Sequence, residues 1–92
     1  MTWGSPEESE RRRRIRVSVW AYAYELLDRS LVSDETFDRE CKLVDPSIST
    51  GHEVLDAFFR EQFADYTGQW VHRHPEKQKL AALARSYIHK QF

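Results

Sequence analysis

Apolar residues recur at intervals of three and four along residues 5–30, which is the spacing of side chains on one face of an α-helix. This segment is therefore predicted to be one long helix with a single buried stripe. The predicted stripe consists of Ile15, Val19, Trp20, Ala23, Tyr24 and Leu27.

Three later segments, residues 33–44, 50–64 and 75–91, show the same spacing and are predicted to be helices. Between the last two, the apolar pair Trp70 and Val71 is expected to fold back onto the core. The predicted inward faces carry Phe37, Cys41 and Val44, then Val54, Leu55, Phe58, Phe59 and Phe63, then Leu80, Leu83, Ala84, Tyr87 and Ile88.

Polar residues and prolines predict the ends of these helices. Ser5, Ser33 and Thr50 precede acidic residues, and their side chains are expected to accept hydrogen bonds from the first helical turns. Pro46 must follow the end of the second helix because proline disfavours a helical residue before it, and Pro75 is expected to begin the fourth. The fold is therefore predicted to be all-α, a small four-helix domain with an antiparallel N-terminal helical hairpin.

The composition of residues 1–92 is typical of one small helical domain, because 40% of the residues are hydrophobic and glycine and proline contribute only three each. The formal net charge of −1 gives no overall field that would attract nucleic acid or an anionic membrane. The single cysteine, Cys41, cannot form an internal disulfide, and no leader-like start or long apolar run is found. A cytoplasmic location without membrane insertion is expected.

A run of arginines occupies the first predicted helix, at Arg11, Arg12, Arg13, Arg14 and Arg16. Glutamates lie four positions before three of them, which is the favourable orientation for ion pairs along a helix. One interpretation is a solvated, ion-paired helix face. The other is a docking surface on which the arginines bind nucleic acid or an acidic protein.

The sequence contains no arrangement that is typical of catalysis or of metal binding. His52, His72, His74 and Cys41 lack the spacing of zinc ligands, and Cys41 is better explained as a small buried residue. The three glycines lie too far apart to form a phosphate-binding loop. The chain is therefore predicted not to be an enzyme, and to have no catalytic residue, metal or cofactor.

Aromatic and acidic residues lie close together around the connection between the first two helices. Tyr24 is near the end of the first helix, while Asp34, Phe37 and Asp38 share one face of the second. In one interpretation the rings belong to the core and the carboxylates stabilise the helices. In the other, the rings clamp a planar cationic ring by cation–π attraction, and the carboxylates accept hydrogen bonds from a ribose or an amide.

The first half of the chain resembles domain Ia, the N-terminal helical subdomain of NAD-dependent DNA ligases. The residues that carry this resemblance are Tyr22, Tyr24, Asp28, Val32, Asp34, Phe37, Asp38 and Arg39. In that family the subdomain grips the nicotinamide mononucleotide half of NAD. The resemblance implies that Tyr24 stacks on the ring and that Asp34 and Asp38 make polar contacts. Glu25 stands where the family has a histidine, and Phe37 where it has a second stacking tyrosine.

In residues 49–63 and 67–76, STGHEVLDAFFREQF and TGQWVHRHPE, the second half resembles short stand-alone proteins of phages and mobile elements that are described as ligase-related. The chain has no Lys-x-Asp-Gly motif of the ligase adenylation domain. It is therefore expected to be a small non-enzymatic binding module of phage or mobile-element origin. Its expected partner is a host protein or ribonucleoprotein complex, such as a defence complex inhibited in the manner of anti-CRISPR proteins. Two alternatives are a nicotinamide nucleotide (NMN or NAD) binding module and nucleic-acid binding through the Arg11–Arg16 face.

Overall fold

The computed structural model describes residues 4–90, and this part of the chain is helical without any β-strand. The elements are the α-helices α1 (Pro6–Leu27), α2 (Asp34–Leu43), α3 (Glu53–Glu61) and α4 (Lys77–Lys90), with a short 3-10 helix, η1 (Gln69–Arg73), before α4. The predicted all-α class with four helices is confirmed. The last residue of the predicted fourth helix, at position 91, lies outside the described residues.

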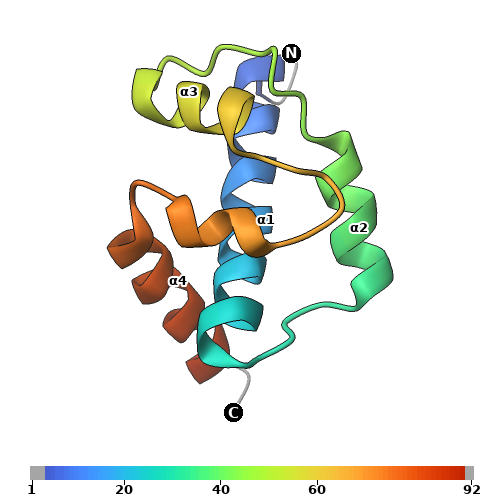
Figure 1. The fold of residues 1–92 in the computed structure, drawn as a ribbon, viewed down its shortest axis with the longest axis vertical. Helices are drawn as coiled ribbons and strands as arrows, with labels where there is room; N and C mark the ends of the chain where they lie inside the picture. The colour runs from blue at the N-terminus through green and yellow to red at the C-terminus, as the bar shows by residue number, and fades with distance from the viewer. Residues whose placement is uncertain (1–3, 91–92) are drawn as a thin grey trace.

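Helix α1 lies at the centre of the molecule, with α2 and α4 on its two sides, η1 across its middle and α3 near its N-terminal end (Figure 1). A short connection over residues 28–33 joins α1 to α2, and the two helices run in opposite directions. This is the antiparallel N-terminal hairpin that the sequence predicts.

Side-chain caps fix the starts of the first two helices as predicted. The Ser5 hydroxyl accepts a hydrogen bond from the Glu8 backbone N–H (3.2 Å), and Ser33 accepts one from the Thr36 N–H (3.1 Å). At the other end of α1, Asp28 adopts a left-handed conformation with φ of 55°. This conformation ends the helix and turns the chain toward α2.

The third and fourth helices begin later than the sequence predicts. Helix α3 starts at Glu53 because His52, not Thr50, supplies the cap: its Nδ1 accepts a hydrogen bond from the Leu55 N–H at 3.4 Å. The Thr50 side chain is used elsewhere, as described below. Helix α4 starts at Lys77, two residues after Pro75.

The core combines one face of each outer element with several faces of α1. The predicted folding back of Trp70 and Val71 is confirmed, since both are buried. The Trp70 ring packs against Phe59 and Phe63, with centroids 5.7 Å and 5.0 Å away. The buried apolar residues are Val17, Val19, Ala21, Ala23, Cys41, Val44, Phe58, Phe59, Trp70, Val71, Leu80, Ala81 and Ala84.

Several residues of the predicted stripes lie on the surface instead of in the core. They are Ile15, Tyr24, Val54, Leu83 and Tyr87. On α1, residues outside the predicted stripe, such as Val17 and Ala21, are fully buried in their place. The reason is that α1 is enclosed by neighbours on more than one side, so its buried positions do not follow a single stripe.

Candidate binding site

A pocket of about 320 Å³ opens where the end of α1, the connection to α2 and the first turns of α2 meet the loop before η1. We call it the corner pocket. The residues that line it are Trp20, Ala21, Tyr24, Glu25, Ser30, Leu31, Val32, Asp34, Phe37, Asp38, Thr67 and Gly68.

The structure brings all four of the predicted ligand-binding residues to the corner pocket. Tyr24 reaches it from α1, while Asp34, Phe37 and Asp38 reach it from α2. Tyr24 is 58% exposed, so it belongs to the pocket wall and not to the core. Trp20 adds a third aromatic ring that sequence reasoning assigned to the core. Trp20 lines the pocket because of the tertiary fold, and no local sequence pattern predicts this position.

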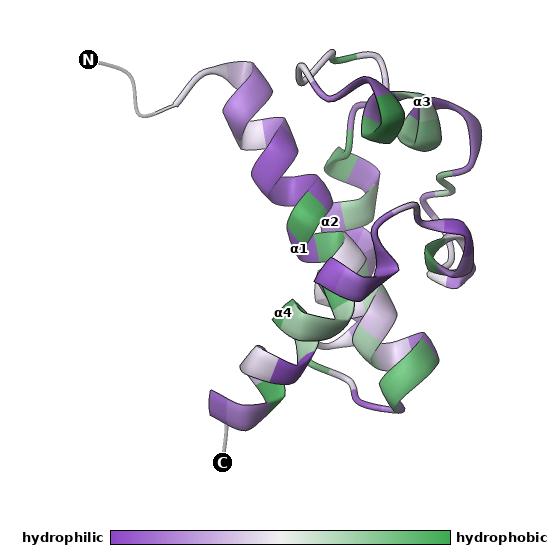
Figure 2. Cartoon of the chain, turned by 90° about the vertical axis from the view of Figure 1, so that its left-hand side faces the viewer, coloured by the Kyte–Doolittle hydropathy of each residue, from purple (hydrophilic) through white to green (hydrophobic). Residues whose placement is uncertain are grey.

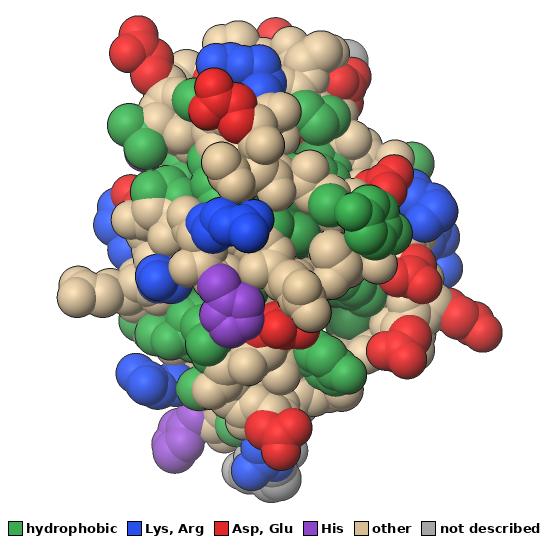
Figure 3. All heavy atoms as spheres, in the orientation of Figure 1, with side chains coloured by type: hydrophobic (Ala, Val, Ile, Leu, Met, Phe, Trp, Pro, Cys, Tyr) green, Lys and Arg blue, Asp and Glu red, His purple; other side chains and the backbone are tan. Residues whose placement is uncertain are grey.

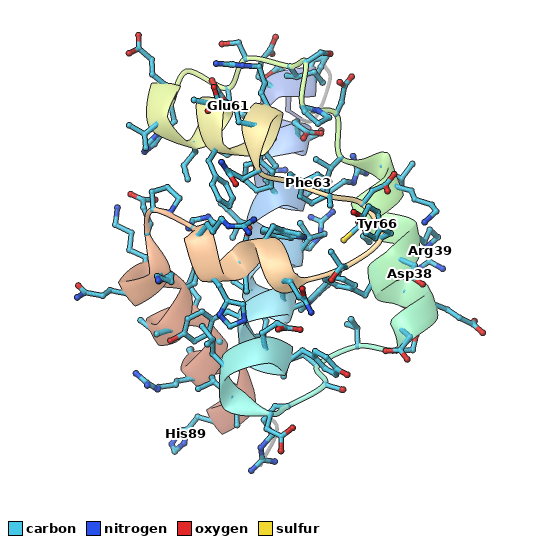
Figure 4. All side chains as sticks on the ribbon, in the orientation of Figure 1. Asp38, Arg39, Glu61, Phe63, Tyr66 and His89 are labelled. Carbon is cyan, nitrogen blue, oxygen red and sulfur yellow. The ribbon has the colours of Figure 1, made fainter. Side chains whose placement is uncertain are left out.

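The far wall of the pocket depends on a close approach of the loop before η1 to the hairpin. A Cβ atom placed on Gly68 would lie 3.3 Å from the Ala21 Cβ and 3.5 Å from the Phe37 Cζ. Glycine therefore lets this loop lie against both helices. Tyr66 belongs to the same loop (Figure 4).

The corner pocket is acidic, and most of its carboxylates have no partner within residues 4–90. Within residues 4–90, the carboxylates of Asp34 and Asp38 have no hydrogen bond or ion pair to another side chain, and no lysine or arginine lines the pocket. Acidic side chains also dominate the surface over the lower part of α2 (Figure 3). Aromatic walls and free carboxylates suit a flat cation.

Glu25 is the exception, because it has a partner outside the pocket. Its Oε1 lies 3.0 Å from the Nε2 of His72, which is in η1. The contact ties the wall of the pocket to η1. It also places the His72 imidazole beside Glu25, the position at which the resembled ligases have a histidine.

The arginine run is divided between the surface and the interior. Arg11 and Arg12 are exposed, whereas Arg13 and Arg16 both contact Glu40 of α2, at 3.5 Å and 3.1 Å. The Arg16 hydrogen bond is the main reason why the pKa of Glu40 is below its usual value.

Arg14 corrects the prediction of an arginine docking surface, because it is only 4% exposed. In Figure 2 the N-terminal half of α1 is largely hydrophilic, yet Arg14 and Glu10 from this half point into the protein. Arg14 therefore contributes nothing to a docking surface.

Arg14 instead joins Glu10 of α1 to Asp56 of α3 in a buried charged cluster, a name used below for these three residues. Its Nε donates to Glu10 (2.7 Å) and one terminal nitrogen donates to Asp56 (2.8 Å). Its other terminal nitrogen donates to the carbonyls of Asp45 and Ile48, both at 2.9 Å. The guanidinium also lies 5.1 Å from the centre of the Phe59 ring.

The same cluster fixes the loop between α2 and α3. Glu10 accepts the Asp45 N–H at 3.1 Å, and Asp56 accepts both the N–H and the hydroxyl of Thr50, at 3.0 Å and 2.6 Å. Burial by itself would raise the pKa of Asp56, but the hydrogen bonds from Thr50 and Arg14 outweigh this effect. The pKa of Asp56 is therefore below its usual value. Sequence reasoning missed this cluster because nothing in the spacing of residues 10 and 14 distinguishes a buried pair from an exposed one.

Three further observations concern metals, the thiol and membranes. Among the described residues, no group of three or more His, Cys, Asp or Glu side chains is placed to hold a metal ion. Burial raises the pKa of the Cys41 thiol to about 12, so this cysteine is unreactive. No helix in the described part of the chain has the length and apolar character needed to cross a membrane.

Comparisons with protein-family models, with curated proteins and with solved structures found no match to this chain. The resemblance to ligase domain Ia therefore stays a prediction from the residues of the corner.

Proposed function

We propose that the chain is a non-enzymatic binding module and that its corner pocket binds a nicotinamide nucleoside or nucleotide. The nicotinamide ring of these ligands is a planar cation. The observation that supports this best is the pair of carboxylates, Asp34 and Asp38, that share the pocket with three aromatic rings and have no partner within residues 4–90. Both carboxylates are exposed to solvent and the fold leaves them unpaired, so a ligand can reach them.

The sugar of such a ligand fits the same side chains. Ribose hydroxyls donate hydrogen bonds, and ionised carboxylates only accept them. The pocket volume of about 320 Å³ is at the small end of ligand pockets, which span about 300 to 1,000 Å³. A ring and a sugar are therefore a better match in size than a whole dinucleotide.

A phosphate group finds little support in the corner pocket. Glu25 carries a negative charge where the ligase resemblance would put a histidine, and no lysine or arginine lines the wall. We therefore expect nicotinamide riboside to bind more tightly than nicotinamide mononucleotide, since only the second carries a phosphate.

Isothermal titration of the chain with both ligands tests this proposal. The riboside should bind more tightly, and Glu25→Gln should narrow the difference about fivefold, because a unit charge at about 4 Å in water is worth about 1 kcal/mol. Glu61→Gln, an exposed carboxylate on α3, is the matched control and should change neither affinity. Absence of binding by both ligands at millimolar concentration would contradict the proposal.

A protein partner is the second candidate, favoured by Tyr66. This residue is 79% exposed and lies on the loop between α3 and η1 (Figure 4). Tyrosine and arginine are the residues that most often dominate protein interfaces. In this form the chain is a phage or mobile-element module that binds a host protein or ribonucleoprotein complex and blocks a defence system.

Affinity purification with wild type, Tyr66→Ser and Tyr87→Ser tests the second candidate. Tyr87, on α4, is also exposed and serves as the matched control. A partner that is lost with Tyr66→Ser alone supports this candidate, and a partner retained by all three proteins contradicts the role of Tyr66.

Nucleic-acid binding through the Arg11–Arg16 face is the weakest of the three proposals. Arg14 is buried, and Arg13 and Arg16 are paired with Glu40, so Arg11 and Arg12 are the exposed arginines that remain. So small a basic surface predicts weak, strongly salt-dependent binding. Gel shifts at low and moderate salt test this, and affinity that does not fall with salt would rule it out.

A further inference from the structure

A second cavity, of about 250 Å³, lies between the N-terminal half of α1, helix α3 and the start of α4. It shares no lining residue with the corner pocket. Its walls are mainly apolar and are formed by Ile15, Leu55, Phe59, Leu80 and Leu83. We call it the apolar cavity.

One polar group that lines this cavity has no partner in the protein. The Ser18 hydroxyl oxygen is buried and forms no hydrogen bond within residues 4–90, and Ser18 as a whole is 1% exposed. A serine inside a helix commonly satisfies its hydroxyl with a backbone carbonyl one turn earlier, which does not occur here. Leaving a buried hydroxyl unpaired is unfavourable, so Ser18 would gain from a ligand that offers a hydrogen bond.

His74 is the second polar group of the cavity, and it is 5% exposed. Its Nδ1 accepts a hydrogen bond from the Glu76 N–H at 3.0 Å, which leaves the Nε2–H as the remaining donor of the ring. Burial lowers the pKa of His74 to about 4, so the ring is neutral at physiological pH. Ser18 and His74 are therefore both neutral buried polar groups of the cavity, and the buried charge in its lining, Arg14, is paired.

Arginine and lysine side chains outnumber carboxylates in the lining of the cavity. Arg11 donates to the Thr50 carbonyl, a neutral acceptor, and has no ion pair within the described residues. Lys79 lies 3.0 Å from Glu76, which is the only carboxylate in the lining. Arg14 also lines the cavity, but it is bound by two carboxylates, Glu10 and Asp56, so the buried charged cluster adds no positive charge.

We propose that the apolar cavity binds a small aromatic carboxylic acid with a ring hydroxyl, its ring against the apolar walls, its hydroxyl at Ser18 and its carboxylate near Arg11 and Lys79. The size agrees with a single ring, because a cavity of about 150 Å³ suffices for benzene. The extra volume, up to about 250 Å³, accommodates the hydroxyl and a short acid side chain.

Titration of the full chain with three related probes tests the chemistry of this site. The probes are para-hydroxyphenylpropanoate, phenylpropanoate, which lacks the hydroxyl, and tyramine, which replaces the acid by a cation. We expect the hydroxy acid to bind about tenfold more tightly than phenylpropanoate, as one hydrogen bond of about 1.4 kcal/mol predicts. Tyramine should bind most weakly. Equal binding of tyramine and the hydroxy acid would overturn the proposal.

Two variants assign the contacts. Ser18→Ala should weaken the hydroxy acid about tenfold and leave phenylpropanoate unchanged. Because the wild-type hydroxyl is unpaired, this variant should keep or raise the melting temperature, so a loss of binding cannot be attributed to unfolding. Arg11→Gln with Lys79→Gln should weaken both acids and not tyramine. A Ser18→Ala protein that binds both acids like wild type, or the absence of binding by all probes at millimolar concentration, would overturn the assignment.

Discussion

The buried charged cluster and the corner pocket use the same kinds of side chains, carboxylates beside aromatic rings, in opposite ways. In the cluster, both oxygens of Glu10 and both oxygens of Asp56 accept hydrogen bonds. In the pocket, Asp34 and Asp38 accept none from other side chains within residues 4–90. The comparison indicates that buried charges paired by the fold stabilise it, whereas exposed charges that the fold leaves unpaired are available for binding.

The largest effect should come from removing the cation of the buried cluster. Arg14→Met leaves Glu10 and Asp56 buried without their partner, which typically costs about 3 to 5 kcal/mol. This is a large fraction of the stability of a small domain. Urea unfolding followed by circular dichroism measures it. Arg12→Met removes only an exposed pair with Glu8 and should cost less than about 0.5 kcal/mol. Similar losses in both variants would contradict the comparison.

His74, which packs against the rings of Phe58 and Phe59, should make the free energy of unfolding depend on pH. Burial lowers its pKa from 6.5 to about 4, so between these values the unfolded chain binds a proton that the folded protein does not. Stability is therefore complete above pH 6.5 and should fall by up to about 3 kcal/mol as the pH drops toward 4.

Unfolding measured across this pH range checks the prediction, with two variants as controls. His74→Gln keeps an acceptor for the Glu76 N–H but cannot titrate, so its profile should be nearly flat. His72→Gln changes an exposed histidine and should keep the wild-type slope. A slope that survives in His74→Gln would assign the effect to other groups.

Removing one unpaired carboxylate of the corner pocket should change binding and not stability. Asp38→Asn should weaken nicotinamide riboside about tenfold, since one charge-assisted hydrogen bond of about 1.4 kcal/mol is lost. The free energy of unfolding should change by less than about 0.5 kcal/mol. Glu35→Gln, an exposed residue of α2 outside the pocket lining, is the control and should bind normally. Equal weakening by both variants would indicate a general charge effect.

The smallest effect should come from Glu40, a half-buried residue between the two regions. Its hydrogen bond from Arg16, with the nearby Arg13, lowers the pKa of Glu40, so its contribution to stability is present above its usual pKa and is lost as the pH falls through the lowered value. Glu40→Gln should cost about 0.5 to 1 kcal/mol at neutral pH. The difference between wild type and this variant should disappear in acid, as unfolding at two pH values would show.

The helices could be predicted because their signals are local. The serine caps at positions 5 and 33 and the spacing of apolar residues are determined by neighbours within one or two turns. The start of α3 could not be read in this way. Thr50 has the sequence position of a cap, but its hydroxyl bonds to Asp56, and this choice depends on the buried Arg14 from a distant part of the chain.

The corner residues could be placed together because the hairpin that holds them is itself local. The same reasoning failed for Arg14 and Ile15, whose exposure depends on how α3 and α4 pack around α1. It also could not distinguish Asp34 and Asp38 from Glu10 and Asp56, because the sequence does not show which carboxylates find a partner.

The most direct measurement of the central claim is a titration with nicotinamide riboside followed by amide chemical shifts. Shifts should concentrate at residues 20–38 and at 67–68, which surround the unpaired carboxylates, whereas residues 10–14 and 45–56 around the buried charged cluster should stay unchanged. Shifts confined to the second group, or none at millimolar ligand, would contradict it.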